Sequence, residues 1–246
     1  MIKRGKKAQI TLFIIVAVII AAVILTFYFI NSSQQQVQQK TSASVRNYVQ
    51  GCIESTAKIG LEGMGLQAGY IVPPNETVSY EAIDIAYWYS FGKEKIPSLS
   101  VLETEFSNFL NENVAFCNNW SAFSDVNISS GNVSSRTKIV NDSVTIDIVW
   151  PITVTQKSGE IQKLEFFSKK FNIRLGRIYD AAKLIIAEQA KNPQSPCLSC
   201  MIDIISARGF TGELRFYNDS LIYTVYDAKS LLNDKIYEFK FAGKIK

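Results

Sequence analysis

The chain has 246 residues, 47% of them hydrophobic and 20% charged, which suits a folded domain and excludes a disordered one. Four basic residues, Lys3, Arg4, Lys6 and Lys7, account for its net charge of +4, because the remainder holds 22 basic and 22 acidic residues. We therefore expect no nucleic-acid partner. The absence of histidine excludes Ser-His-Asp and Cys-His catalysis and every zinc site that uses histidine.

An apolar run from Ile10 to Ile30 follows this basic cluster and contains Thr11 and Thr26 as its polar members. In a helix a run of this length spans roughly 30 Å, the thickness of the hydrocarbon core of a bilayer. Basic residues precede the run, and the next charge is Lys40. We predict a single transmembrane helix in the cell membrane, with the N-terminus in the cytoplasm and the remainder outside. The run is too long for an ordinary cleaved secretory signal.

Another processing route is indicated by Lys7-Ala8-Gln9-Ile10, where a basic and a small residue stand immediately before the apolar run. This arrangement resembles the cleavage site of archaeal type IV pilin-like precursors, which are cut before the hydrophobic helix and keep it. The resemblance implies a cut between Ala8 and Gln9. The family usually carries Glu at the fifth mature position, and the chain departs from that pattern with Phe13.

After the run, a polar stretch of good helix formers leads into a helical stripe of Val45, Val49, Cys52, Thr56 and Ile59. The sequence thus predicts a first helix outside the membrane, ahead of the main domain. We divide the chain into four parts: a cytoplasmic basic segment 1–9, a transmembrane helix 10–30, a helical stalk 31–66 and an extracytoplasmic domain 67–246.

Seven of the fifteen asparagines lie in Asn-X-Ser/Thr sequons, which mark surface positions in exported proteins. The alternative is that loops rich in Asn and Ser generate sequons by composition, but the sequons are spread along the chain. We expect glycans at several of the seven: Asn31, Asn75, Asn119, Asn127, Asn132, Asn141 and Asn218.

The four cysteines agree with an oxidising compartment and permit three disulfide pairings. We favour Cys52 with Cys117 and Cys197 with Cys200, because the last two are close in sequence. A C-x-x-C at a helix start is also where a reactive thiol lies, since the helix dipole lowers the pKa of the first thiol. A thioredoxin-like enzyme would place a strand directly before Cys197, whereas a helix and a Pro-rich loop precede it. A structural disulfide is therefore favoured over redox catalysis.

The rest of the chain alternates between helical and strand patterns. The aromatic run at 78–91 is interpreted as core and edge packing rather than as a sugar-stacking or partner surface. Ser100-Val-Leu-Glu103 is a capping box that predicts a helix to about Phe116, and the polar segment 118–135 is interpreted as a loop. We predict a structural ion pair among Arg174, Arg177 and Asp180, which lie at a strand-to-helix junction.

Alternation of period two at 144–150 predicts a strand, a turn at 157–160 joins it to a second strand, and together they form a hairpin. Two helices and three short strands are then expected, at 176–191, 197–207, 213–217, 221–226 and 235–241. The predicted fold class is α+β, with an N-terminal transmembrane helix that continues into an amphipathic helix, an antiparallel sheet and packed helices.

Several motifs together resemble a family of uncharacterised single-pass membrane proteins in archaeal genomes. They are Lys7-Ala-Gln-Ile-Thr-Leu-Phe-Ile14, Gly51-Cys-Ile-Glu54, Gly65-Leu-Gln-Ala-Gly-Tyr-Ile71, Tyr87-Trp88, Pro97-Ser98, Arg174-Leu-Gly-Arg-Ile-Tyr-Asp180 and Cys197-Leu-Ser-Cys200. The resemblance implies an anchored, exported domain and no particular reaction.

These observations predict a cell-envelope protein with a structural or interaction role. Its expected partners are the lipid bilayer and either envelope or surface proteins or other copies of itself. We predict no catalytic, cofactor-binding or metal-ligating residue and no cofactor. Two alternatives stay open: a pilin-like subunit cut at Ala8/Gln9 and assembled through its apolar helix, and an envelope thiol oxidoreductase that uses Cys197 and Cys200.

Overall fold

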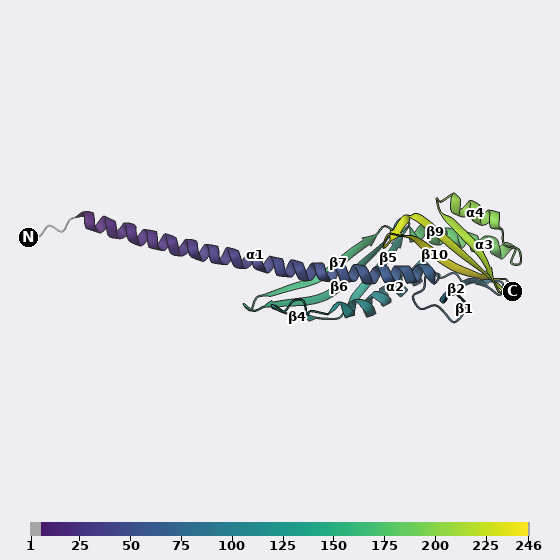
Figure 1. The fold of residues 1–246 in the computed structure, drawn as a ribbon, viewed down its shortest axis with the longest axis horizontal. Helices are drawn as coiled ribbons and strands as arrows, with labels where there is room; N and C mark the ends of the chain where they lie inside the picture. The colour runs from purple at the N-terminus through teal and green to yellow at the C-terminus, as the bar shows by residue number, and fades with distance from the viewer. Residues whose placement is uncertain (1–5, 246) are drawn as a thin grey trace, which may run out of the picture. The chain divides into compact units, whose positions relative to one another are not determined.

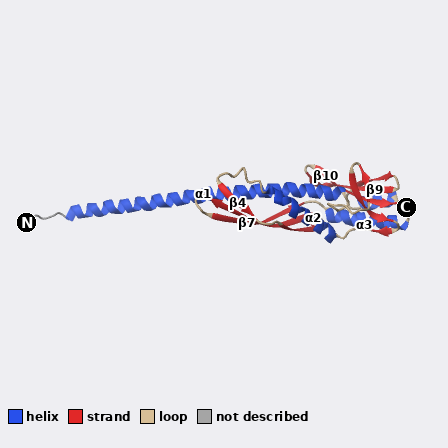
Figure 2. Cartoon of the chain, turned by 90° about the horizontal axis from the view of Figure 1, so that it is seen from below, coloured by secondary structure: helices blue, strands red, loops and turns tan. Residues whose placement is uncertain are grey.

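The structure is a computed structural model that describes the backbone of residues 6–245 and the side chains of residues 19–26 and 43–245. It has the predicted α+β class. The chain divides into two compact units, Met1–Tyr48 and Val49–Lys246. All ten strands of the described residues belong to the second unit (Figure 1, Figure 2).

The first unit is helical from Lys6 onward, as the beginning of helix α1, Lys6–Leu66. Within it, the hydroxyl of Thr26 donates to the carbonyl oxygens of Ala22 and Val23, which satisfies this polar group inside the helix. Among the helices whose side chains are described, none is long and apolar enough to cross a membrane. The side chains of Ala8, Gln9 and Asn31, and part of the predicted span 10–30, lie outside the described residues.

The last part of α1 supplies one wall of the core of the second unit. Its inward positions recur every three or four residues, as one face of a helix requires, and are almost fully buried: Val49, Ile53, Ala57, Leu61 and Met64. The helix ends at Leu66, and Ala68 and Gly69 follow with positive φ angles of 60° and 90°. The amide of Gly69 donates to the carbonyl of Met64, which closes the helix with a left-handed turn.

A six-stranded sheet contains the aromatic run and the C-terminal strands. Its order is β1-β2-β10-β9-β8, with β3 also paired to β2. The strands are β1 Thr77–Tyr80, β2 Ile83–Ser90, β3 Lys93–Glu94, β8 Thr211–Tyr217, β9 Ser220–Leu232 and β10 Lys235–Lys244. The prediction of an antiparallel sheet is wrong at one place, because β2 and β10 run parallel. These two strands are distant in sequence, so no hairpin turn imposes an antiparallel direction on them.

A separate four-stranded antiparallel sheet contains β4 Val126–Ser130, β5 Ser134–Val140, β6 Ser143–Gln156 and β7 Ile161–Phe171. Strand β6 is central: β4 and β5 pair with its two halves, and β7 pairs with its other edge. Pro151 lies in this central strand at a register shift, where the amide of Gly131 donates to its carbonyl. Strand β4 corrects the prediction that 118–135 is a loop, because pairing with β6 orders a segment whose side chains are mostly polar.

Four further helical segments complete the described fold: α2 Leu99–Asn113, η1 Val114–Cys117, α3 Leu175–Lys191 and α4 Leu198–Ser206. Helix α2 packs on β5, while α3 contacts β10 and α4 contacts β8. In Figure 1, α3 and α4 accordingly lie beside the C-terminal strands, which are drawn in green to yellow.

The start of α2 corrects the predicted capping box. Ser98 is the N-cap, and its hydroxyl accepts from the amide of Val101. Ser100 and Glu103 lie inside the helix instead. The carboxylate of Glu103 accepts a hydrogen bond from the amide of Ile139 on β5. Glu103 therefore makes a tertiary contact in place of the predicted capping contact.

Two glycines of α1 provide a test of how closely the helix approaches the sheet. A Cβ atom at Gly65 would lie 2.4 Å from the carbonyl oxygen of Glu238 on β10, whereas one at Gly63 would meet nothing within 4 Å. We expect Gly65→Ala to lower the free energy of unfolding by about 1 to 3 kcal/mol, because the backbone of β10 must move. Gly63→Ala should raise it by roughly 0.5 to 1 kcal/mol, since alanine favours the helix.

Urea denaturation of the detergent-solubilised chain, followed by tryptophan fluorescence, measures both effects. All three tryptophans lie in the second unit, so the signal reports on the domain. Equal effects of the two substitutions would contradict the close approach of α1 to β10.

Candidate functional site

The first disulfide is the predicted one between Cys52 and Cys117. It joins α1 to η1 across 65 residues of sequence, and Cys117 is 2% exposed. The bond therefore holds η1, the segment that follows α2, against α1 inside the core. Its buried position and its long loop are typical of a structural cross-link.

The second disulfide joins Cys197 and Cys200, also as predicted. Cys197 is the N-cap of α4, and its sulfur accepts a hydrogen bond from the amide of Cys200 at 3.2 Å. The hydroxyl of Ser199 lies 3.5 Å from the same sulfur. Both cysteines are half-buried. The pair is therefore exposed enough to meet a reagent from solvent, unlike Cys117.

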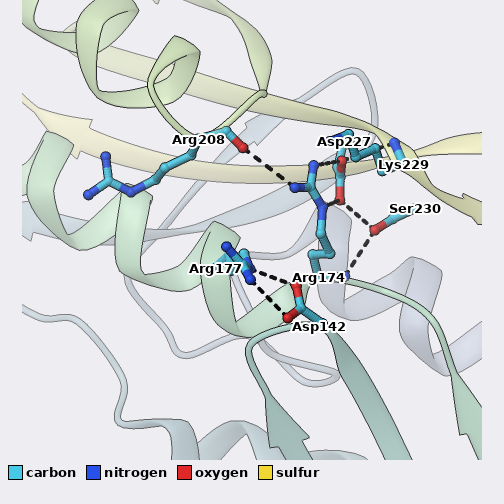
Figure 3. A network of polar contacts seen from close by, with 7 residues as sticks. All are labelled: Asp142, Arg174, Arg177, Arg208, Asp227, Lys229 and Ser230. Atoms are coloured by element: carbon cyan, nitrogen blue, oxygen red, sulfur yellow. Dashed lines mark hydrogen bonds and ion pairs between the residues drawn. The ribbon is translucent and has the colours of Figure 1, made fainter.

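A charged network joins the start of α3 to β9 (Figure 3). The guanidinium of Arg174 makes a bidentate contact with Asp227, one arm at 2.8 Å, and also donates to the carbonyl of Arg208. The carboxylate of Asp227 is fully buried and accepts further from the hydroxyl of Ser230 and the amide of Lys229. Burial alone would raise the pKa of Asp227, but these hydrogen bonds together hold that pKa below its usual value.

A second arginine of the same helix start makes a different kind of ion pair. Arg177 contacts Asp142 of the β5–β6 hairpin through both carboxylate oxygens, with both side chains about half exposed. The hydrogen bond and the charge of Arg177 lower the pKa of Asp142. The prediction of structural ion pairs holds for both arginines. Their partners are Asp227 and Asp142, which lie far away in sequence, rather than the neighbouring Asp180.

The aromatic run is mostly core. Trp88 is fully buried and packs edge-on against Tyr179 and Phe239, and its indole nitrogen donates to the carbonyl of Ala68. Tyr87 and Tyr89 are also buried, whereas Phe91, in the turn directly after β2, is 66% exposed. The interpretation of this run as core packing is therefore confirmed for β2, and it does not form a continuous sugar-stacking surface.

Six of the seven sequon asparagines lie among residues with described side chains, and all six are exposed: Asn75, Asn119, Asn127, Asn132, Asn141 and Asn218. Three of them, Asn119, Asn127 and Asn132, lie before, within and after the edge strand β4. Exposure permits a glycan at each position. Glycosylation itself stays a prediction.

The described surface also contains small hollows. One of about 60 Å³ lies between the end of α1 and the β9–β10 turn, lined by Glu62, Leu66, Leu232 and Lys235 among others. It is far smaller than the 300 to 1,000 Å³ typical of small-molecule sites. Another, of about 300 Å³, is an open depression beside Asp125 and Lys157 at the end of β4.

Titratable residues do not gather into a catalytic constellation among the described side chains, and no group of three or more metal-ligating residues occurs there. Within this part of the chain, Cys197–Cys200 is the more exposed of the two disulfides. Comparisons with known protein families, with curated proteins and with solved structures returned no match.

Proposed function

We propose that the first helix anchors this protein in a membrane and that the second unit is an extracytoplasmic module with a structural or interaction role in the cell envelope. The observation that carries the proposal is that α1 contains both an apolar run and part of a folded core. One uninterrupted helix of 61 residues includes both the apolar run 10–30 and the stripe that enters the core of the second unit.

The chemistry of the second unit supports its export. Two disulfides are stable in an oxidising compartment, and every sequon asparagine with a described side chain is exposed. The four basic residues before the apolar run support a cytoplasmic N-terminus. The partners that this proposal implies are the lipid bilayer and other envelope proteins or further copies of the chain.

Deletion of residues 2–30 tests the anchor directly. We expect the full chain to stay in the membrane pellet after alkaline carbonate extraction, and the shortened chain to be soluble and folded. Protease added outside intact cells should digest the second unit of the full chain. Release of the full chain by carbonate would overturn the anchor, and protection of the domain in intact cells would overturn its outside location.

A second candidate function is a pilin-like subunit, favoured by Lys7-Ala8-Gln9 directly before the apolar part of a very long helix. The chain would be cut between Ala8 and Gln9 and would assemble through that helix. Phe13 in place of the usual Glu weighs against it. The N-terminal mass of the protein from native membranes separates the two: a start at Gln9 supports the pilin-like subunit, and a start at Met1 or Ile2 supports the permanent anchor.

A further inference from the structure

The two disulfides differ in what their opening would do to the fold. Cys52–Cys117 closes a long loop and is part of the core, whereas Cys197–Cys200 closes a loop of three peptide bonds at the start of α4. Because loop-closure entropy rises with loop length, the short bridge contributes much less to stability. The short bridge can therefore open without unfolding the domain.

Helix α4 is held in place by contacts that do not involve this disulfide. Met201 and Ile205 are each 3% exposed and pack toward Gly212 of β8, and the amide of Phe210 donates to the carbonyl of Ile205. None of these contacts depends on the bond between the two sulfurs, so we expect the helix start to keep its position in the dithiol form.

The surroundings of Cys197 favour its thiolate. Its sulfur already accepts from the amide of Cys200 and lies beside the Ser199 hydroxyl, and it occupies the N-cap of α4. Each of these donors, and the positive end of the helix, stabilises a negative charge on that sulfur. Cys200 lies inside the first turn, and no donor among the described residues contacts its sulfur. The two thiols are therefore unequal.

An exposed apolar surface adjoins the pair. Leu198 and Ile202, one turn apart on α4, are 53% and 51% exposed, while Met201 and Ile205 of the same helix are buried.

From these observations we propose that Cys197–Cys200 is redox-active and exchanges with disulfides of partner proteins, with Cys197 as the attacking thiolate. This reactivity goes beyond the anchoring role and does not depend on it.

The exchange balances in two steps. The Cys197 thiolate attacks one sulfur of the partner's disulfide, so that the partner's S–S bond breaks, a mixed disulfide forms and the other partner sulfur leaves as a thiolate. The Cys200 thiolate then attacks the Cys197 sulfur, the second partner sulfur leaves, and both partner thiolates take up protons. Two electrons pass to the partner, and Cys197–Cys200 is oxidised. A low-molecular-weight thiol of the glutathione class, or a protein dithiol, returns the pair to its reduced form by the reverse exchange.

The first test is a redox titration of the full-length chain in detergent with reduced and oxidised glutathione. Free thiols are alkylated at each point and mapped by mass spectrometry, while tryptophan fluorescence reports folding. We expect Cys197–Cys200 to open while Cys52–Cys117 stays closed and the fluorescence stays native. Opening of the two bonds together, or only with loss of native fluorescence, would overturn the proposal.

The second test compares two single substitutions. Cys200→Ser retains Cys197 as a free thiol, and Cys197→Ser retains Cys200. At pH 6, we expect the Cys200→Ser variant to form a mixed disulfide with oxidised glutathione at least about threefold faster than the Cys197→Ser variant. Each variant retains the buried disulfide as an internal control for folding. Equal rates for the two variants would remove Cys197 from the role of attacking thiolate.

Discussion

Replacement of Arg174 by Met is expected to lower the free energy of unfolding at pH 7 by about 3 to 5 kcal/mol. Methionine preserves much of the side-chain volume, so packing against the ring of Phe210, which lies 4.7 Å from the guanidinium carbon, is largely kept. The carboxylate of Asp227 would then remain fully buried without a countercharge. Its hydrogen bonds from Ser230 and Lys229 would only partly offset that loss.

The size of this effect should depend on pH. Because the pKa of Asp227 is lowered in the folded protein, the ion pair contributes stability above the ordinary aspartate pKa of about 3.9. That contribution disappears as the pH falls through the lower, folded value. The difference between the natural chain and Arg174→Met should therefore shrink from pH 7 to pH 3, when urea denaturation is measured at both.

Arg177→Met is the matched control, since it removes the other arginine of the same helix start. Its partner Asp142 is 60% exposed, and water can solvate the freed carboxylate. We expect little change in stability. Equal destabilisation of the domain by the two substitutions would contradict the proposal that the buried Arg174–Asp227 pair holds α3 to β9.

Removal of the buried disulfide by the double substitution Cys52→Ala and Cys117→Ala is expected to cost about 4 kcal/mol of stability, from the entropy of closing a 65-residue loop. The segment η1 should then separate more easily from α1. Limited proteolysis near Phe116, which is 80% exposed, would report that separation, and urea denaturation under non-reducing conditions would give the stability.

The second disulfide provides the comparison for this prediction. By the same loop-entropy argument, Cys197→Ser with Cys200→Ser should cost about 2 kcal/mol or less. A larger loss from this pair than from the buried pair would show that the short bridge is structural. It would also weaken the argument that the bridge opens without unfolding.

Much of the fold could be predicted where local pattern and tertiary environment agree. Strand β6 shows alternating burial from Val144 to Val154, as its period-two pattern predicts. Helix α3 spans 175–191, within one residue of its prediction, because its apolar stripe and the following prolines specify both its face and its end. The short disulfide was predictable from proximity in the chain alone.

Other features depend on partners that the local sequence does not identify. Strand β4 has few apolar residues, and only its pairing with β6 orders it. Glu103 matches a capping motif, but the amide of Ile139 is its actual donor. The candidate redox pair is evident in the sequence as a C-x-x-C, but the hydrogen bond from the Cys200 amide to Cys197 and the exposure of Leu198 and Ile202 depend on the folded structure.

The amino-acid sequence by itself therefore determined the α+β class and the long first helix, and it favoured the Cys197–Cys200 pair, because periodicity, charge and short spacing act over a few residues. Tertiary structure alone decided the parallel alignment of β2 with β10, the partners of Arg174 and Arg177, and which aromatic side chains are buried. These depend on contacts between segments that are far apart in the chain. Such contacts form only when the whole core packs, so a local pattern does not specify them.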